Sequence, residues 1–251
     1  MSDLEGIRQR RSIRKYKPDP VPREAIEEVL GAAILAPSGK NRQPWKFLVY
    51  QGAAKAALLD EMEKGIARET GENAALPGLA SGLVYAGATL RTMRAAPVVI
   101  LVLNTNAASP FEAGTPESRF MAMYDDLAVG AAMQNLLIRA AELGLGTLWI
   151  DNTGYAYEEL IRFVGTEHRL VGAVALGWPD EAPKARPRKP LADVMEWREE
   201  LGGRLLKPPC KLRTLPKGGV RFLYVLPVRQ KHTTKRQDSK NIGKTHKKLK
   251  K

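Results

Sequence analysis

The ten residues 36–45, APSGKNRQPW, separate a helical pattern from an apolar run. Three of them, Ser38, Gly39 and Asn41, are turn formers that bend the backbone and present amide and side-chain donors. Pro44 stops any continuing helix, and the residues that follow it are bulky and mostly apolar. The segment therefore predicts a polar, donor-rich loop between a helix and a strand.

A second polar cluster, RRSIR at residues 10–14, precedes this loop. Arg10, Arg11 and Arg14 bring three permanently charged, planar guanidiniums into five residues, and Ser12 adds a hydroxyl. Guanidiniums bind phosphate through paired hydrogen bonds, so the cluster predicts an anion site. A solvated basic segment is the alternative interpretation of the same residues.

RRSIRKY at residues 10–16 and APSGKNRQPWKF at residues 36–47 together resemble the nitroreductase family of FMN-dependent oxidoreductases that use NAD(P)H. Three later segments follow in the order found in that family: APVVI at 96–100, GLGTLWI at 144–150 and RPRKPL at 186–191. The resemblance covers roughly residues 4–198.

Hydrophobic periodicity predicts the elements around these segments. Helices are expected at 23–35, 53–64, 125–143 and 157–164, and strands at 47–50, 98–103, 147–150 and 170–176. Residues 65–88 and 104–118 lack clear periodicity and are expected to be loops, the first of them a mobile excursion over the site. The irregular order of elements, without a GxGxxG turn, indicates an α+β fold.

The resemblance implies more about the architecture. It implies a mixed, mostly antiparallel sheet flanked by helices, in an intertwined homodimer that holds FMN at its interface. The helix expected at 125–143 contains small residues that would let another helix approach closely: Ala128, Gly130, Ala131 and Ala132. The residues alone leave open whether this helix belongs to the core or to the subunit interface, and the resemblance favours the interface.

Charge divides the chain into two parts. Residues 201–251 contain 16 Lys or Arg and one acid, whereas residues 1–200 contain 24 basic and 26 acidic side chains. We therefore expect a nitroreductase-like FMN-binding domain at 1–200 and a basic, disordered C-terminal extension at 201–251. Nucleic acid is expected as a partner only non-specifically, through that extension.

Composition also bears on the compartment and on metals. The sequence has no run of eighteen apolar residues and no hydrophobic signal core, so we expect a cytoplasmic protein without a membrane partner. The single cysteine, Cys210, and the three histidines, His168, His232 and His246, lack metal-ligand spacing. No metal site is expected.

By the resemblance, two basic segments hold the FMN phosphate. The first supplies Arg10, Arg11, Ser12 and Arg14, and the second supplies Arg186, Arg188 and Lys189. For the second segment, an ordinary charged and proline-rich surface loop is the alternative.

The resemblance also implies contacts with the flavin ring. The loop residues Pro37, Ser38, Gly39 and Asn41 are expected to reach the flavin of the partner subunit, which would couple FMN affinity to dimerisation. Trp149, Ile150, Asp151 and Asn152 are expected beside flavin N5, where a backbone amide donates a hydrogen bond. Related proteins often have Glu-Gly in place of Asp151-Asn152, and Trp149 also fits a core position.

A cation near the flavin O2 is the last contact that the resemblance implies. Arg91 is expected there, with Arg94 as the alternative, because a positive charge at this position stabilises the anionic reduced flavin.

The expected activity is hydride transfer from NADH or NADPH to FMN, followed by electron transfer to a small flat acceptor such as a nitroaromatic or a quinone, in a ping-pong cycle. The flavin performs this chemistry, so no catalytic side chain is expected. One alternative is a flavin-fragmenting or reductive-dehalogenating enzyme on the same scaffold. Another is a flavin-binding redox protein without turnover.

Overall fold

The computed structural model describes residues 5–198. Its single sheet has the strand order β1-β2-β4-β3, where β1 is Trp45–Tyr50, β2 is Val98–Asn104, β3 is Gly146–Ile150 and β4 is Arg169–Gly177. Every neighbouring pair of these strands is antiparallel. The expectation of a mixed sheet is corrected accordingly: over the described residues, the parallel pairing is an isolated bridge between Ser12 and Thr147.

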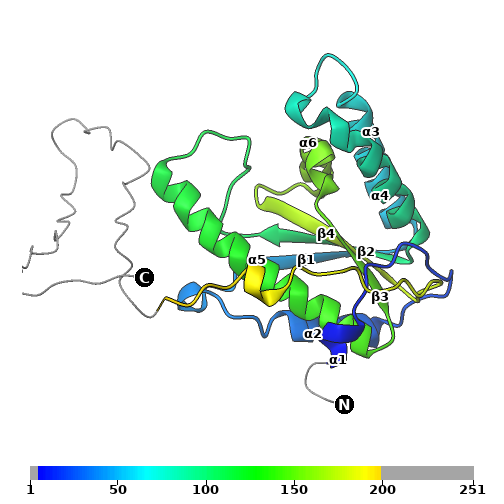
Figure 1. Cartoon of the computed structure of the whole chain (residues 1–251). Coiled ribbons are helices and arrows are strands. Elements are labelled where there is room, and N and C mark those ends of the chain that lie inside the picture. The colour runs from blue at the N-terminus through cyan, green and yellow to red at the C-terminus, as the bar shows by residue number, and fades with distance from the viewer. Residues whose placement is uncertain (1–4, 199–251) are drawn as a thin grey trace, which may run out of the picture. The chain divides into compact units, whose positions relative to one another are not determined.

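Helices cover both faces of the sheet (Figure 1). On one face lie α2 (Arg23–Ala33) and α5 (Pro116–Glu142), with α1 (Glu5–Gln9) against α5. On the other lie α3 (Gly52–Arg68), α4 (Leu83–Ala95) and α6 (Tyr157–Val164). The short 3-10 turns are η1 (Gly39–Asn41), η2 (Pro77–Gly82), η3 (Asn152–Ala156) and η4 (Leu191–Asp193). The expected α+β fold is confirmed.

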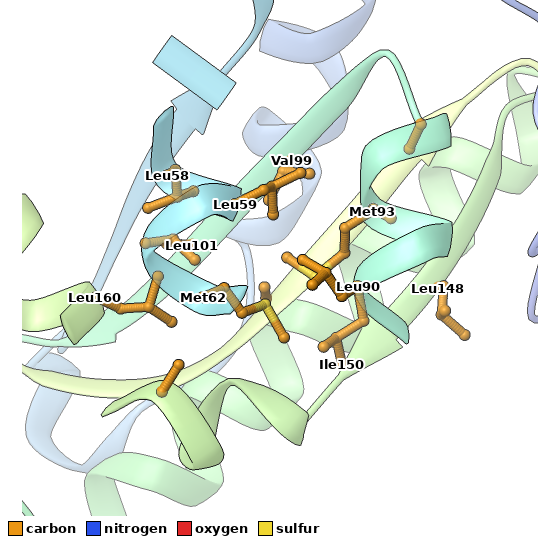
Figure 2. Packing of buried hydrophobic residues seen from close by; sticks show 14 of the residues in the cluster. Leu58, Leu59, Met62, Leu90, Met93, Val99, Leu101, Leu148, Ile150 and Leu160 are labelled. Atoms are coloured by element: carbon orange, nitrogen blue, oxygen red, sulfur yellow. The ribbon is translucent and has the colours of Figure 1, made fainter. Parts of the chain in front are cut away.

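Strand β2 joins two hydrophobic layers. All its residues are buried, and because side chains alternate along a strand, Val99 and Leu101 face one layer whereas Ile100 and Val102 face the other. Figure 2 shows the first layer, which contains Leu58, Leu59 and Met62 of α3, Leu90 and Met93 of α4, Leu148 and Ile150 of β3, and Leu160 of α6. Burying each large apolar side chain stabilises the fold by about 1.5–3 kcal/mol. This layer fixes β3 against α4.

The expectation of a loop at residues 65–88 is wrong in part. Helix α3 runs to Arg68, and α4 begins at Leu83 after the turn η2. The glycines of this segment blur its hydrophobic stripe, although Ala86, Leu90 and Met93 are buried along α4.

The long helix α5 begins earlier than expected, at Pro116 instead of residue 125. Thr115 caps its N-terminus, because the Thr115 hydroxyl accepts a hydrogen bond from the Ser118 amide at 3.1 Å. Apolar side chains of the first turns, such as Phe120 and Tyr124, are exposed. They therefore give no buried stripe that periodicity detects. Helix α6 has its expected bounds, and the other predicted helices and strands are present with ends moved by a few residues.

The described residues fall into two units that divide after Arg188. The sheet and helices α1–α6 belong to the first unit, and η4 belongs to the second. The basic extension expected at 201–251 lies outside the described residues. Among helices of residues 5–198, none is both long enough and apolar enough to cross a membrane.

Candidate functional site

The basic segment 10–14 lies along the free edge of β3. Ser12 forms its parallel bridge with Thr147, and the Ile13 amide donates to the Thr147 carbonyl at 2.8 Å. Ile13 is buried and lies over Gly146, where a Cβ atom would approach Ile13 to 2.8 Å. The glycine therefore permits the segment to dock closely against the strand.

Further hydrogen bonds hold the backbone around Arg14. The Glu181 carboxylate accepts from the amides of Arg14 and Lys15, and the Tyr16 hydroxyl donates to the Ile13 carbonyl at 2.9 Å. Burial, and then the nearby Glu181 carboxylate, raise the pKa of Tyr16 above its usual range, so this hydroxyl stays a donor. The backbone is thus fixed while the Arg14 side chain remains exposed.

The neighbouring arginines point elsewhere. Arg11 Nη1 donates to the carbonyls of Arg8 and Arg10 at 2.5 and 2.9 Å, so its guanidinium turns toward the end of α1. Arg11 lines a separate hollow of about 370 Å³. Arg10 is half-buried. Arg14 lines a cleft between β3 and α4, and Arg10 does not.

That cleft has a volume of about 300 Å³ and lies between the end of β3 and α4. Its lining comprises Arg14, Tyr85, Ala88, Thr89, Thr92, Leu148, Trp149, Ile150, Asp151 and Asn152. The structure therefore brings together predicted site residues from two segments far apart in the sequence: Arg14 from the first, and residues 149–152 from the second.

Side-chain hydrogen bonds order one wall of the cleft. Trp149 Nε1 donates to Asp151 Oδ1 at 2.6 Å, and the Asn152 side-chain amide donates to Thr89 Oγ1 at 2.9 Å. Trp149 also packs against the layer formed by α2 and α5, so it serves the core and the cleft together. The cleft consequently combines a cation, a carboxylate, hydroxyls and a flat indole.

The α4 residues of the cleft are absent from the predicted site. Tyr85, Ala88, Thr89 and Thr92 have the spacing i, i+3, i+4 and i+7, which places them on one helical face. The sequence therefore contains a signal that these four residues share one face of a helix. The glycines at 65–88 obscure it by favouring a loop.

Two arginines of α4 lie outside the cleft lining. Arg94 donates to Asp60 and Glu63 of α3 at 3.0 and 2.8 Å, so it is engaged elsewhere. Arg91 is exposed, and its guanidinium lies near Gly87, one turn earlier on the same helix. A role for Arg91 at the flavin stays a prediction.

The loop 37–44 lies at the opposite edge of the sheet from Arg14. It leads into β1, and in the order β1-β2-β4-β3 three strand spacings, about 14 Å, separate β1 from β3. The predicted loop residues Pro37, Ser38, Gly39 and Asn41 do not line the cleft. A single chain therefore does not bring them to Arg14.

The same loop has a strained backbone. Lys40, Asn41 and Gln43 have φ angles of +53°, +55° and +48°, in the left-handed region that costs a non-glycine residue about 1–2 kcal/mol. The Ser38 hydroxyl accepts from the Gln43 amide at 2.9 Å, and the Ser38 carbonyl accepts from the Asn41 amide at 3.0 Å. Strain of this kind concentrates at functional sites, where the surroundings enforce it.

The second basic segment follows β4. Arg186 and Arg188 are exposed, and Arg188 Nη1 donates to the Arg186 carbonyl at 3.1 Å. Neither lines the cleft, and Lys189 belongs to the second unit. Their approach to a phosphate stays a prediction.

A profile described as the nitroreductase family matches residues 7–178. The match includes both walls of the cleft, the loop 37–44 and all strands of the sheet. The chain belongs to the nitroreductase family.

Individual nitroreductase relatives cover most of the chain. One relative is YfhC of Bacillus subtilis (strain 168), which is named provisionally as an NAD(P)H nitroreductase. It is 28% identical to this chain over 190 residues, and the match covers 74% of this chain and 89% of YfhC. A Rhodospirillum rubrum protein named 5,6-dimethylbenzimidazole synthase is 29% identical over 177 residues, covering 68% of this chain and 79% of that protein.

A solved nitroreductase structure also matches. The crystal structure of a provisionally named nitroreductase from Desulfovibrio desulfuricans in complex with FMN has a TM-score of 0.58 and 28% identity, and the match covers 79% of this chain and 97% of that one. The expected nitroreductase-like fold and enzyme family are confirmed.

The donor chemistry of the cleft fits the FMN that the nitroreductase family implies. Arg14 offers a cation to a phosphate, Thr92 and Asn152 offer polar contacts, and Trp149 offers a flat surface. Volume alone does not select the site. A larger hollow, of about 670 Å³ beside α6, contains none of the predicted FMN residues.

Proposed function

We propose that this chain is an NAD(P)H-dependent FMN oxidoreductase that works as a homodimer. The observation that carries the proposal is the cleft that gathers Arg14 with residues 149–152. Family membership supports the reaction class, and the FMN complex of the Desulfovibrio relative supports the cofactor. When bound, FMN would accept a hydride from NADH or NADPH and then reduce a nitroaromatic, a quinone or a similar acceptor in a ping-pong cycle.

In this proposal the segment 10–14 binds the phosphate. Arg14 lines the cleft, and Ser12, which lies outside the lining on the bridge to Thr147, would add a hydroxyl. Arg10 and Arg11 add positive charge nearby, and three residues of the second basic segment complete the set: Arg186, Arg188 and Lys189. Several cations around one dianion would give strong, salt-dependent binding.

The wall at residues 149–152 is proposed to face the flavin ring. Trp149 provides apolar surface, the backbone of Ile150 and Asp151 provides amides for the ring edge, and Asn152 is held to α4 through Thr89. Arg91 does not line the cleft, and its contact with the flavin is part of the proposal. These groups bind and orient the reactants, and no side chain breaks a bond.

A second copy of the chain is proposed to complete each cleft. Because the loop 37–44 lies three strands from its own Arg14, it would serve the cleft of the partner. The first half of α5 exposes an apolar strip that suits a contact between copies: Phe120, Met121, Met123, Tyr124 and Leu127, each at least 40% exposed. Exposed apolar strips of this kind often mark interfaces.

The visible absorption spectrum of the purified protein tests the proposed function. A flavin spectrum, release of FMN on denaturation, and bleaching by NADH or NADPH without oxygen are the expected results. Sedimentation should show a dimer. A colourless protein that also fails to bind added FMN would overturn the proposal.

A second candidate function has specific support from one comparison. The relative named 5,6-dimethylbenzimidazole synthase is as similar to this chain as the relative named for nitroreduction. Enzymes that consume the flavin itself on this scaffold are therefore the alternative. Incubating the protein with FMN, NADPH and oxygen, and analysing for 5,6-dimethylbenzimidazole, separates the two: this product supports the alternative, and intact FMN with reduced acceptor supports the oxidoreductase.

A further inference from the structure

An ion pair ties the strained loop 38–43 to helix α5. Arg42 Nη2 donates to Asp125 Oδ2 at 2.8 Å, and the Asp125 side chain is 3% exposed whereas that of Arg42 is 34% exposed. Within residues 5–198, Arg42 is the side chain that donates a hydrogen bond to the buried Asp125 carboxylate. A buried carboxylate that loses its partner is strongly disfavoured, so Asp125 holds Arg42 firmly.

The pair is placed at the most strained part of the loop. Lys40 and Asn41 precede Arg42, and Gln43 follows it, all three with positive φ. At the end of the loop, the amide and the hydroxyl of Thr105 donate to the Pro44 carbonyl at 2.7 and 3.1 Å. The loop is therefore anchored at its end on the sheet and at its middle on α5.

Helix α5 presents two different surfaces around Asp125. The neighbouring Tyr124 and Leu127 are exposed and belong to the apolar strip proposed to contact the second copy, whereas Asp125 is buried and contacts the loop. One helical turn thus links the proposed subunit contact with the loop conformation.

We propose that the Arg42–Asp125 pair is a positioning device that holds residues 38–43 of one subunit in the shape that completes the FMN cleft of the other. The inference rests on the proposed function, because it takes FMN as the ligand and a dimer as the assembly. Arg42 and Asp125 are positioning residues, not catalytic ones, since they act on the flavin through the loop.

The chain offers a matched control on the same helix. Asp126 receives a hydrogen bond from Arg169 Nη1, also at 2.8 Å, with side-chain exposures of 32% and 19%. This pair ties α5 to β4, and Asp126 also accepts a hydrogen bond from the Asn104 side-chain amide of β2 at 2.8 Å. Among the described residues, neither Asp126 nor Arg169 forms a hydrogen bond with residues 37–44. Its loss should weaken packing without changing the loop.

The first experiment measures the FMN dissociation constant, the apoprotein melting temperature and the oligomeric state for wild type, Arg42→Gln and Arg169→Gln. We expect Arg42→Gln to raise the dissociation constant on the order of tenfold or more, since small displacements of positioning groups have large effects. Arg169→Gln should lower the melting temperature and leave FMN affinity near wild type. Asp125→Asn, which keeps the side-chain shape and removes the charge, replaces Arg42→Gln if that variant does not fold.

The second experiment uses a heterodimer purified through two different tags, with Arg42→Gln in one chain and Arg14→Gln in the other. If the loop acts across the interface, one cleft combines an intact Arg14 with an intact partner loop. We then expect one tight FMN site per dimer. If the loop acts within its own chain, both clefts are damaged and no tight site forms.

Three results would overturn the inference: unchanged FMN affinity in Arg42→Gln, equal losses of affinity in Arg42→Gln and Arg169→Gln, or no tight site in the mixed dimer. Wild-type protein that binds no FMN would instead refute the proposed function. The two failures are therefore distinguishable.

Discussion

Trp149 and Asp151 form a 2.6 Å hydrogen bond, from indole Nε1 to carboxylate Oδ1, in the lining of the proposed FMN cleft. The bond fixes the position of the Asp151 carboxylate in that lining. Arg14, in the same lining, supplies the opposite charge. The electrostatic preference of the cleft for its second substrate should therefore depend on Asp151.

Asp151→Asn removes that charge with little change of shape. In the solvent-accessible cleft, repulsion between the Asp151 carboxylate and an anionic acceptor costs about 1 kcal/mol, roughly a fivefold effect on binding. We expect kcat/KM for a nitrobenzoate to rise by about this factor relative to neutral nitrobenzene. Trp149→Phe, which keeps the carboxylate and removes the donor, is the control. An unchanged ratio in Asp151→Asn would refute a role for this charge.

Glu69 holds the segment between α3 and η2. Its carboxylate accepts from the amides of Ala75 and Leu76, each at 2.9 Å, and pairs with Arg68, which also pairs with Glu159. Burial by itself would raise the pKa of Glu69, but the bonds from Leu76, Ala75 and Arg68 outweigh it and hold the pKa below the ordinary 4.5.

A depressed native pKa means that the charged Glu69 stabilises the fold fully above the ordinary value of 4.5 and loses this contribution as the pH falls through the native pKa. We expect Glu69→Gln to lower the free energy of unfolding by about 1–3 kcal/mol at pH 7. The difference should shrink on acidification toward about pH 3. Urea titrations at both pH values measure it, with the exposed Glu27→Gln as control. A difference independent of pH would contradict this account.

Gly65 lies where helix α3 packs closely on η3. A Cβ at Gly65 would approach the Cα of Ala156 to 2.4 Å, whereas a Cβ at Gly31 on α2 meets nothing within 4 Å. We expect Gly65→Ala to destabilise the protein by about 1–3 kcal/mol or more, because backbone must move. Gly31→Ala should stabilise it by about 0.5–1 kcal/mol through helix propensity. Thermal unfolding of both variants checks the opposite signs, and equal effects would show that packing at η3 is looser than the distances indicate.

Leu127 is 67% exposed on the strip of α5 proposed to contact a second copy. A charge there would have to be buried on association, so Leu127→Glu should produce monomers at micromolar concentration and lose FMN together with the dimer. Phe163→Glu on α6, at 40% exposure, is the control outside that strip. Analytical ultracentrifugation with detection at the flavin absorbance reports both properties. A Leu127→Glu dimer that keeps its flavin would rule out this face as the interface.

Sequence patterns predict the elements whose burial follows a simple period. The run 98–103 is apolar throughout because β2 is buried on both of its faces. The segment 157–164 is amphipathic because helix α6 buries only one of its own faces. The start of α5 breaks this rule. Phe120 and Tyr124 are apolar but exposed, so they carry no information about a buried face.

The candidate site was predictable where it depends on local motifs and unpredictable where it depends on packing. Arg14 and residues 149–152 follow from the motifs, and one cleft gathers them. The pairing of Arg42 with Asp125 joins residues 83 positions apart. Only the packing of α5 against the loop reveals it.

The docking of Ser12 and Ile13 on β3 has a consequence for handling the protein. β3 is the last strand of its sheet, and an uncovered strand edge is a template for pairing with other chains. The segment that carries Arg14 therefore also shields an edge that would otherwise invite aggregation. Trimming the N-terminus through residue 14 would remove the shield along with the arginine. Poor solubility of such a truncated protein should not be mistaken for an effect of losing the proposed FMN.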